Sequence, residues 1–110
     1  MRELPAALFR SWLHSHEEDH DDVTVFRPEH HPFPPARGRR GMEFAPDGTF
    51  VDRPVGRGDA PDTVRGRWRQ VGDRRVALSF EGGARPERIL EIVRCDEHVL
   101  EVRTSVAQPP

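Results

Sequence analysis

The residues best suited to chemistry alternate along one short stretch near the N-terminus, WLHSHEEDH. In an extended strand alternate side chains share a face, so His14, His16 and Glu18 would point the same way as Trp12. A His-x-His pair with a carboxylate can bind a transition metal or exchange protons near neutral pH. If Leu13 is instead the inward residue, the same polar side chains form a hydrated strand end. Whether Trp12 or Leu13 faces inward therefore decides whether these polar side chains lie inside the fold or at a solvated strand end.

The turn that follows this stretch is strongly acidic. Five of its six positions carry carboxylates: Glu17, Glu18, Asp19, Asp21 and Asp22. They lack the central glycine and distal glutamate of an EF-hand calcium loop. We therefore expect a solvated turn, with arginine as the counter-charge if one is needed.

A stiff, proline-rich loop is expected over residues 28–40, and it carries His30, His31 and Phe33. Such a loop either stays solvated or folds over an open barrel as a lid. Its last basic residues are Arg37, Arg39 and Arg40. Their guanidinium groups can pair with the acidic turn or hold an anionic ligand.

Charge and composition argue against several classes of partner. All 17 basic residues are arginine and the formal net charge is −2, so no global field favours nucleic acid or an anionic membrane. Arginines flank Trp68 at alternate positions, but we expect this tryptophan in the core and no nucleic-acid partner. The absence of lysine is typical of a GC-rich, bacterial genome. With no apolar run long enough for a membrane helix and no signal-peptide pattern, we expect a cytoplasmic protein without membrane contact.

Cys95 is the single cysteine, so an internal disulfide is excluded and a reducing compartment is expected. Its neighbours Asp96 and Glu97 raise the pKa of a thiol and disfavour the thiolate. We therefore expect a poor nucleophile at this position.

The rest of the chain alternates β-prone runs with turn residues. Three short turn sequences, Asp-Gly, Gly-Asp and Cys-Asp-Glu-His, each separate two such runs, which predicts three hairpins. The expected strands cover residues 12–18, 23–27, 41–45, 49–55, 64–71, 75–81, 88–94 and 99–105. One or two helical turns within residues 4–13 lead into the first strand.

Sequential strands without intervening helices predict an all-β fold. Val76, Leu78 and Phe80 alternate with smaller or polar residues, as a half-buried strand requires. Closure of the sheet would remove its exposed edges. We therefore expect one domain over residues 1–106, an antiparallel up-and-down barrel of about eight strands with a short N-terminal helix, and a disordered tail at 107–110.

With these motifs in place, the chain resembles small bacterial lipocalin-like proteins of the calycin type, an uncharacterised family. Trp12 follows a short helical lead-in, FAPDGTF has the form F-x-x-D-G-x-F of an aromatic hairpin, and Gly66-x-Trp68 repeats the style of those barrels. Arg10 stands where the Gly-x-Trp motif of lipocalins has glycine. The resemblance implies a barrel in which Arg103 of the last strand packs across Trp12.

The combined observations predict a small-molecule-binding barrel with an apolar pocket and His and Arg groups at its open end. The residues expected to contact the ligand are Trp12, His14, His16, Phe44, Phe50, Trp68, Phe80 and Arg103. No cofactor is predicted, and His14, His16 and Glu18 are only weak candidates for a metal site.

One alternative is an enzyme built on the same barrel. His14 or His16, together with Glu18 or Glu43, would then run a proton transfer, an isomerisation or a cyclisation.

A second alternative is an interaction or structural protein with a filled core. Such a protein would work through its outer surface, and a homodimer through Ile89 and Val93 is one form of it.

Overall fold

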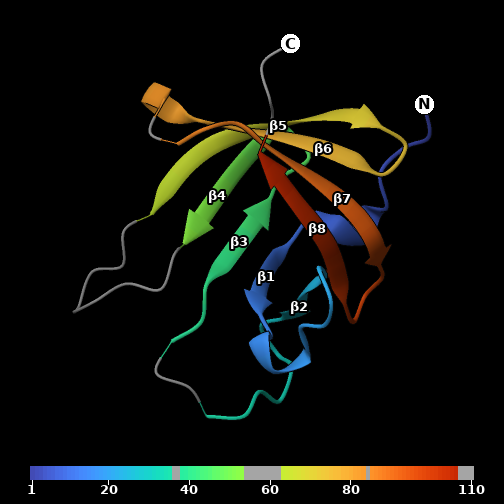
Figure 1. Cartoon of the computed structure of the whole chain (residues 1–110), viewed down its shortest axis with the longest axis vertical. Coiled ribbons are helices and arrows are strands. Elements are labelled where there is room, and N and C mark those ends of the chain that lie inside the picture. The colour runs from blue at the N-terminus through green and yellow to red at the C-terminus, as the bar shows by residue number, and fades with distance from the viewer. Residues whose placement is uncertain (36–37, 54–62, 84, 107–110) are drawn as a thin grey trace.

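The computed structural model describes residues 1–35, 38–53, 63–83 and 85–106. Its elements, shown in Figure 1, are the 3-10 turns η1 (Ala6–Leu8), η2 (His16–Glu18) and η3 (Glu81–Gly83) and eight strands. The strands are β1 (Ser11–His14), β2 (Thr24–Pro28), β3 (Gly41–Phe44), β4 (Thr49–Arg53), β5 (Val64–Gly72), β6 (Arg75–Phe80), β7 (Arg88–Cys95) and β8 (Leu100–Val106). The structure does not describe residues 54–62, which include the end of the strand expected over residues 49–55, nor Arg37 and the tail at 107–110.

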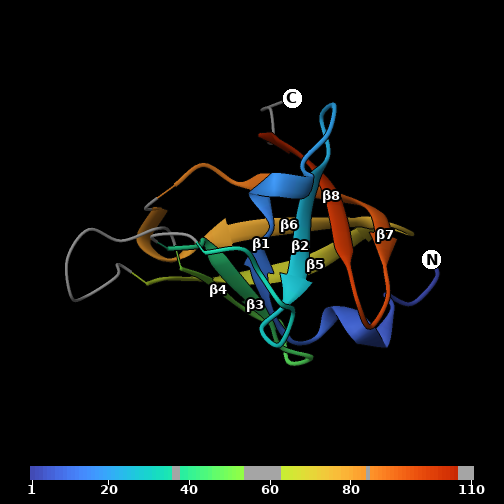
Figure 2. The same ribbon diagram turned by 90° about the horizontal axis from the view of Figure 1, so that it is seen from below.

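The eight strands form a closed antiparallel barrel in the ring order β1-β2-β8-β7-β6-β5-β4-β3. Strand direction alternates around the ring, so the predicted up-and-down barrel is confirmed. One connection departs from a simple meander, because β1 lies between β2 and β3 and pairs with both. Figure 2 shows β1 between these two strands.

The three predicted hairpins form where the local sequence allows a tight reversal. In the β3–β4 turn Gly48 has a positive φ of 95°, and the backbone N–H of Thr49 donates to Asp47 Oδ1 at 2.9 Å. Glycine adopts this backbone without a steric penalty, and an Asp side chain satisfies the turn. The local chemistry of these turns therefore fixes the register of the strands on either side.

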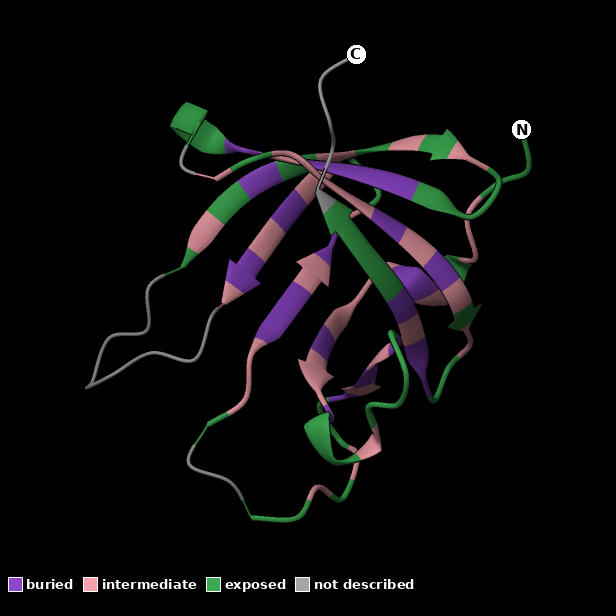
Figure 3. Cartoon of the chain, viewed as in Figure 1, coloured by how far each residue is buried: buried purple, intermediate pink, exposed green. Residues whose placement is uncertain are grey.

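The core lies inside the barrel, because alternate residues of each strand point inward. Figure 3 shows buried residues alternating with partly buried ones along β4 and β7. Buried aromatic rings fill the middle, and the ring centroids of Phe44 and Phe50 lie 5.0 Å apart. At Gly66 a Cβ would lie 2.1 Å from the carbonyl oxygen of Ser79, so β5 and β6 approach as they do only because this residue has no side chain.

The N-terminal turn closes one end of the barrel. Leu8 of η1 is buried, and its carbonyl accepts the indole N–H of Trp12 at 3.1 Å. Phe9 packs on Trp68 with ring centroids 5.5 Å apart, and the indole N–H of Trp68 donates to Ala45 O at 2.7 Å. We call this closed side the apolar end.

The one or two helical turns expected within residues 4–13 form as a single 3-10 turn, Ala6–Leu8. The first strand was expected to continue to Glu18 but ends at His14, where the backbone turns into η2. In the described part of the chain no helix has the length and apolar character needed to cross a membrane.

Candidate functional site

Charged side chains gather at the end of the barrel opposite η1, where β1, β4 and β6 end and β3 and β7 begin. This polar end is defined by His14, Arg40, Asp52, Phe80, Arg85 and Arg88. Each of the strand residues among them continues an inward-facing alternation, as Asp52 does after Phe50. The polar groups therefore form the last layer above the aromatic core.

Asp52 is the central group of this layer, and only 1% of it is exposed. Arg40 Nε donates to Asp52 Oδ1 at 3.2 Å, and Arg85 Nη1 donates to its other carboxylate oxygen. A buried carboxylate is tolerated when it is paired and hydrogen-bonded. The carboxylate thus holds two guanidinium groups at the polar end.

Phe80 gives this layer an aromatic surface. The guanidinium carbons of Arg85 and Arg88 lie 5.6 and 5.8 Å from its ring centroid, which is within cation–π range. Among the described residues Arg88 has no ion-pair partner. Two guanidinium groups therefore bind the one buried carboxylate, and a third, that of Arg88, lies over the neighbouring Phe80 ring.

His14 follows Trp12 toward the inside of the barrel. Its ring lies 5.4 Å from that of Phe26, and 24% of its side chain is exposed. Its Nε2 donates to Asp19 Oδ2 at 2.8 Å, and its backbone N–H donates to Arg40 O at 2.8 Å. His14 is therefore tied to the rim of the polar end, and of the two phases considered for this strand it follows the one set by Trp12.

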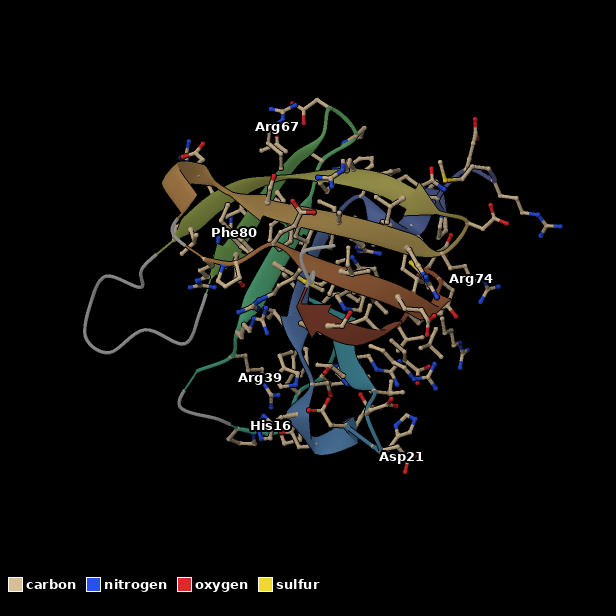
Figure 4. All side chains as sticks on the ribbon, turned by 45° about the horizontal axis from the view of Figure 1, so that its top comes forward. His16, Asp21, Arg39, Arg67, Arg74 and Phe80 are labelled. Atoms are coloured by element: carbon tan, nitrogen blue, oxygen red, sulfur yellow. The ribbon has the colours of Figure 1, made fainter. Side chains whose placement is uncertain are left out.

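The acidic turn is largely exposed, as expected, and several of its carboxylates also pair with arginines. Arg39 makes two hydrogen bonds to Glu17, at 2.8 and 2.6 Å, and lies 4.4 Å over the Phe33 ring. These bonds lower the pKa of Glu17 to about 2. Of the two roles considered for the loop arginines, Arg39 takes the pairing with this turn, and Figure 4 shows it beside His16.

A second bidentate pair joins Arg27 to Glu18, at 2.8 and 2.6 Å. The hydroxyl of Ser15 also donates to Glu18, at 2.7 Å. The hydrogen bonds from Arg27, ahead of that from Ser15, lower the pKa of Glu18 to about 2. These contacts pull the backbone out of the extended form, which explains why the strand stops before His16.

Of the residues considered for acid–base or metal chemistry, the two histidines His14 and His16 lie near each other, with ring centroids 6.1 Å apart, but the candidate carboxylates pair with arginines instead. His16 is 56% exposed and its nearest carboxylate is Glu17, at 3.6 Å, whereas Glu18 is turned to Arg27. Glu43 lies on the outer face with Arg53, 3.5 Å away. In the described ranges no group of three His, Cys, Asp or Glu residues could hold a metal ion.

Most aromatic residues predicted to line a pocket lie in the packed core. Trp12, Phe44 and Phe50 are fully buried against other side chains, and Trp68 is partly covered by Phe9. Phe80 is the member of this set that reaches the polar end. Contact of these residues with a ligand stays a prediction.

The expected packing of Arg103 on Trp12 is wrong. Arg103 points outward because it follows the inward Val102, and it pairs with Asp22 at 2.9 Å and with Glu91 at 3.1 Å. The guanidinium that lies over Trp12 belongs to Arg10, 5.5 Å from the ring centroid.

The proline-rich loop does not place its histidines over the polar end. His30 and His31 line a shallow groove with Arg27 and His98 on the outer side of β2. Of the two arrangements considered for this loop, these histidines therefore do not form the lid.

Sequence reasoning missed Asp52, Arg85 and Arg88. The signal for Asp52 was present, because it stands two positions after Phe50 in a predicted strand and so shares its inward face. Arg88 likewise shares the inward face of Leu90, which stands two positions after it. Arg85 comes from the β6–β7 connection, and no local pattern points to its role.

Comparison of the chain with known protein families, with curated proteins and with solved structures gave no significant match to any of them.

Proposed function

We propose that this protein is a lipocalin-like barrel that binds a small anionic molecule at its polar end. The anionic group would contact Arg40, Arg85 and Arg88, and the apolar body would lie against Phe80. The observation that carries the proposal is the set of three guanidinium groups at this end, of which two bind the buried carboxylate of Asp52 and the third lies over Phe80.

The guanidinium groups are placed where a ligand can reach them. The side chains of Arg40 and Arg85 are 35% and 26% exposed although both bind Asp52. Each guanidinium has five N–H donors in a planar fork that matches a carboxylate or a phosphate. Asp52 occupies only part of this donor set, so the remaining donors support recognition of a second anion.

The packed core supports a shallow site rather than a deep one. Phe44, Phe50 and Leu78 fill the barrel below the polar layer and are at most 2% exposed. A ligand would therefore rest on the end of the barrel, with its charge among the arginines. Such a site favours a compact, flat molecule over a long acyl chain.

Calorimetric titration with 2-naphthoate and with its neutral analogue 2-naphthamide tests this proposal. We expect the carboxylate to bind at least about tenfold more tightly than the amide, since charged hydrogen bonds are the strong ones. Arg88→Gln should weaken naphthoate binding about tenfold. Arg67→Gln, on the exposed outer face of β5, removes the same charge and should leave binding unchanged. Equal affinity for both compounds, or equal effects of both variants, would contradict the proposal.

The two alternative functions have less support from the geometry. For an enzyme, the carboxylates of Glu18 and Glu43 face arginines instead of a histidine. For a docking module, the large hydrophobic residues exposed in the described ranges are Met1 and Val71, whereas Val93 packs against Val23, Val25 and Val99.

A further inference from the structure

A groove of about 580 Å³ lies at the apolar end, between the N-terminal segment, the β5–β6 turn and the end of β7. It is separate from the polar end, and Figure 4 shows Arg74 far from His16 and Arg39. Its lining residues are Arg2, Glu3, Pro5, Asp73, Arg74, Ile92, Val93, Arg94 and Cys95. Its volume falls within the range of about 300–1,000 Å³ that is usual for small-molecule sites.

The walls of this groove are fixed by hydrogen bonds between distant parts of the chain. The backbone N–H of Arg2 donates to Asp73 Oδ1 at 2.9 Å, and the side-chain amide of Gln70 donates to Arg2 O. From the same β5–β6 turn Arg74 Nη1 donates to Val93 O of β7 at 3.2 Å. The N-terminal segment is thereby held beside the barrel as one wall.

The charges that line the groove favour an anion. Three guanidinium groups face two carboxylates, and the carboxylate of Asp73 already accepts a backbone N–H. Arg94 is neutralised in part by Asp96, 3.2 Å away. In the described chain neither Arg2 nor Arg74 has an ion-pair partner. Their free donors can bind a carboxylate or phosphate group.

The floor of the groove is apolar. It consists of Pro5, Ile92, Val93 and the half-buried Cys95. We propose that this groove is a second binding site, which takes a small molecule with a carboxylate or phosphate headgroup at Arg2 and Arg74 and a short apolar body over Val93 and Cys95. The site shares no residue with the polar end.

Cys95 makes the occupancy of this groove measurable. It is the single cysteine of the chain, so a thiol reagent reports on this position alone. Burial, followed by the charge of Asp96, raises the pKa of its thiol to about 11. The alkylation rate is therefore measured at a fixed alkaline pH, where enough thiolate is present.

The experiment measures alkylation of Cys95 by iodoacetamide with hexanoate, hexyl phosphate or the neutral hexanamide present. We expect the two anions to slow the reaction several-fold at concentrations on the order of 1 mM and the amide to have no effect. Protection by one anion and not the other assigns the headgroup. An equal effect of all three compounds, or protection by none, would overturn the proposal.

Matched variants locate the protecting site. Arg74→Gln should raise the half-protecting concentration about tenfold, Arg74→Lys should restore part of the affinity, and Arg67→Gln should change nothing. Thermal unfolding of each variant checks that the barrel is intact. If Arg88→Gln removes protection as Arg74→Gln does, the anion acts from the polar end and the second site is refuted. Retained protection in Arg74→Gln refutes it as well.

Discussion

Replacement of Asp52 by asparagine tests the central feature of the polar end. The side chains have nearly the same shape, so the substitution removes the charge without leaving a cavity. In the unaltered chain Asp52 accepts hydrogen bonds from Arg40 and Arg85 while it is almost fully buried. The variant leaves these two positive charges without a counter-charge above the core.

The expected size of the effect follows from the exposure of the partners. Removal of one member of a buried ion pair costs about 3–5 kcal/mol when the remaining charge stays buried. Here the side chains of Arg40 and Arg85 are 35% and 26% exposed, so both can turn toward water. Asparagine also keeps one acceptor oxygen. We therefore expect a loss of about 2 kcal/mol in the free energy of unfolding.

Urea unfolding at neutral pH and moderate salt measures this loss. Glu43→Gln is the matched control, because Glu43 pairs with Arg53 at 3.5 Å on the exposed face of the neighbouring strand. An exposed pair of this kind should contribute less than about 0.5 kcal/mol. If Asp52→Asn lowers the free energy of unfolding no more than the control does, the buried carboxylate does not fix Arg40 and Arg85 at the polar end.

Three further predictions concern single residues. The pKa of Glu18 is lowered from 4.5 to about 2 by Arg27, so its stabilisation is present above pH 4.5 and is lost as the pH falls toward 2. The full shift corresponds to about 3 kcal/mol, which solvent screening reduces to about 1 kcal/mol, and urea unfolding of Glu18→Gln should show this loss at neutral pH but not near pH 2. Gly66→Ala should lower the free energy of unfolding by about 3 kcal/mol, since its Cβ would lie 2.1 Å from Ser79 O. The alkylation rate of Cys95 should still rise with pH above 9.0, because burial moves the pKa of the thiol from 9.0 to about 11.

Each of these predictions has a result that contradicts it. A constant difference between Glu18→Gln and the unaltered chain across the acid range would mean that the Arg27 pair does not set the pKa of that carboxyl. Wild-type stability of Gly66→Ala would show that β5 and β6 can separate at no cost. A Cys95 rate that levels off near pH 9.0 would show an exposed thiol.

The strands and hairpins could be predicted because they depend on local sequence. Asp47-Gly48 forms a turn through the backbone freedom of glycine and the acceptor oxygen of aspartate. The alternation of Val76, Leu78 and Phe80 selects the inward face of β6 without help from distant residues. Closure of the ring then follows from the number of sequential strands and the need to cover their edges.

The end of β1 could not be predicted in the same way. Alternation alone continues past His14, but Glu18 is drawn to Arg27 and Asp19 accepts the backbone N–H of Val25 at 2.8 Å. These partners lie in β2, so the bend depends on a pairing that the first strand does not encode. The predicted packing of Arg103 on Trp12 was wrong because it rested on the resemblance to lipocalins alone. In β8 the side chain of Val102 faces inward, so that of Arg103 faces outward.

The retention of a charge at Asp52 is itself an argument for function at the polar end. Replacing a buried ion pair with packed hydrophobic residues is often neutral or stabilising. The neighbouring core residues Phe50 and Met42 are as fully buried as Asp52. Stability alone would therefore favour an apolar side chain at this position. The carboxylate instead fixes the orientation of two guanidinium groups. Its two oxygens bind Arg40, which directly precedes β3, and Arg85, which lies in the β6–β7 connection. An apolar residue would leave the barrel closed but would release Arg40 and Arg85, and with them the positive layer that the proposed anion requires.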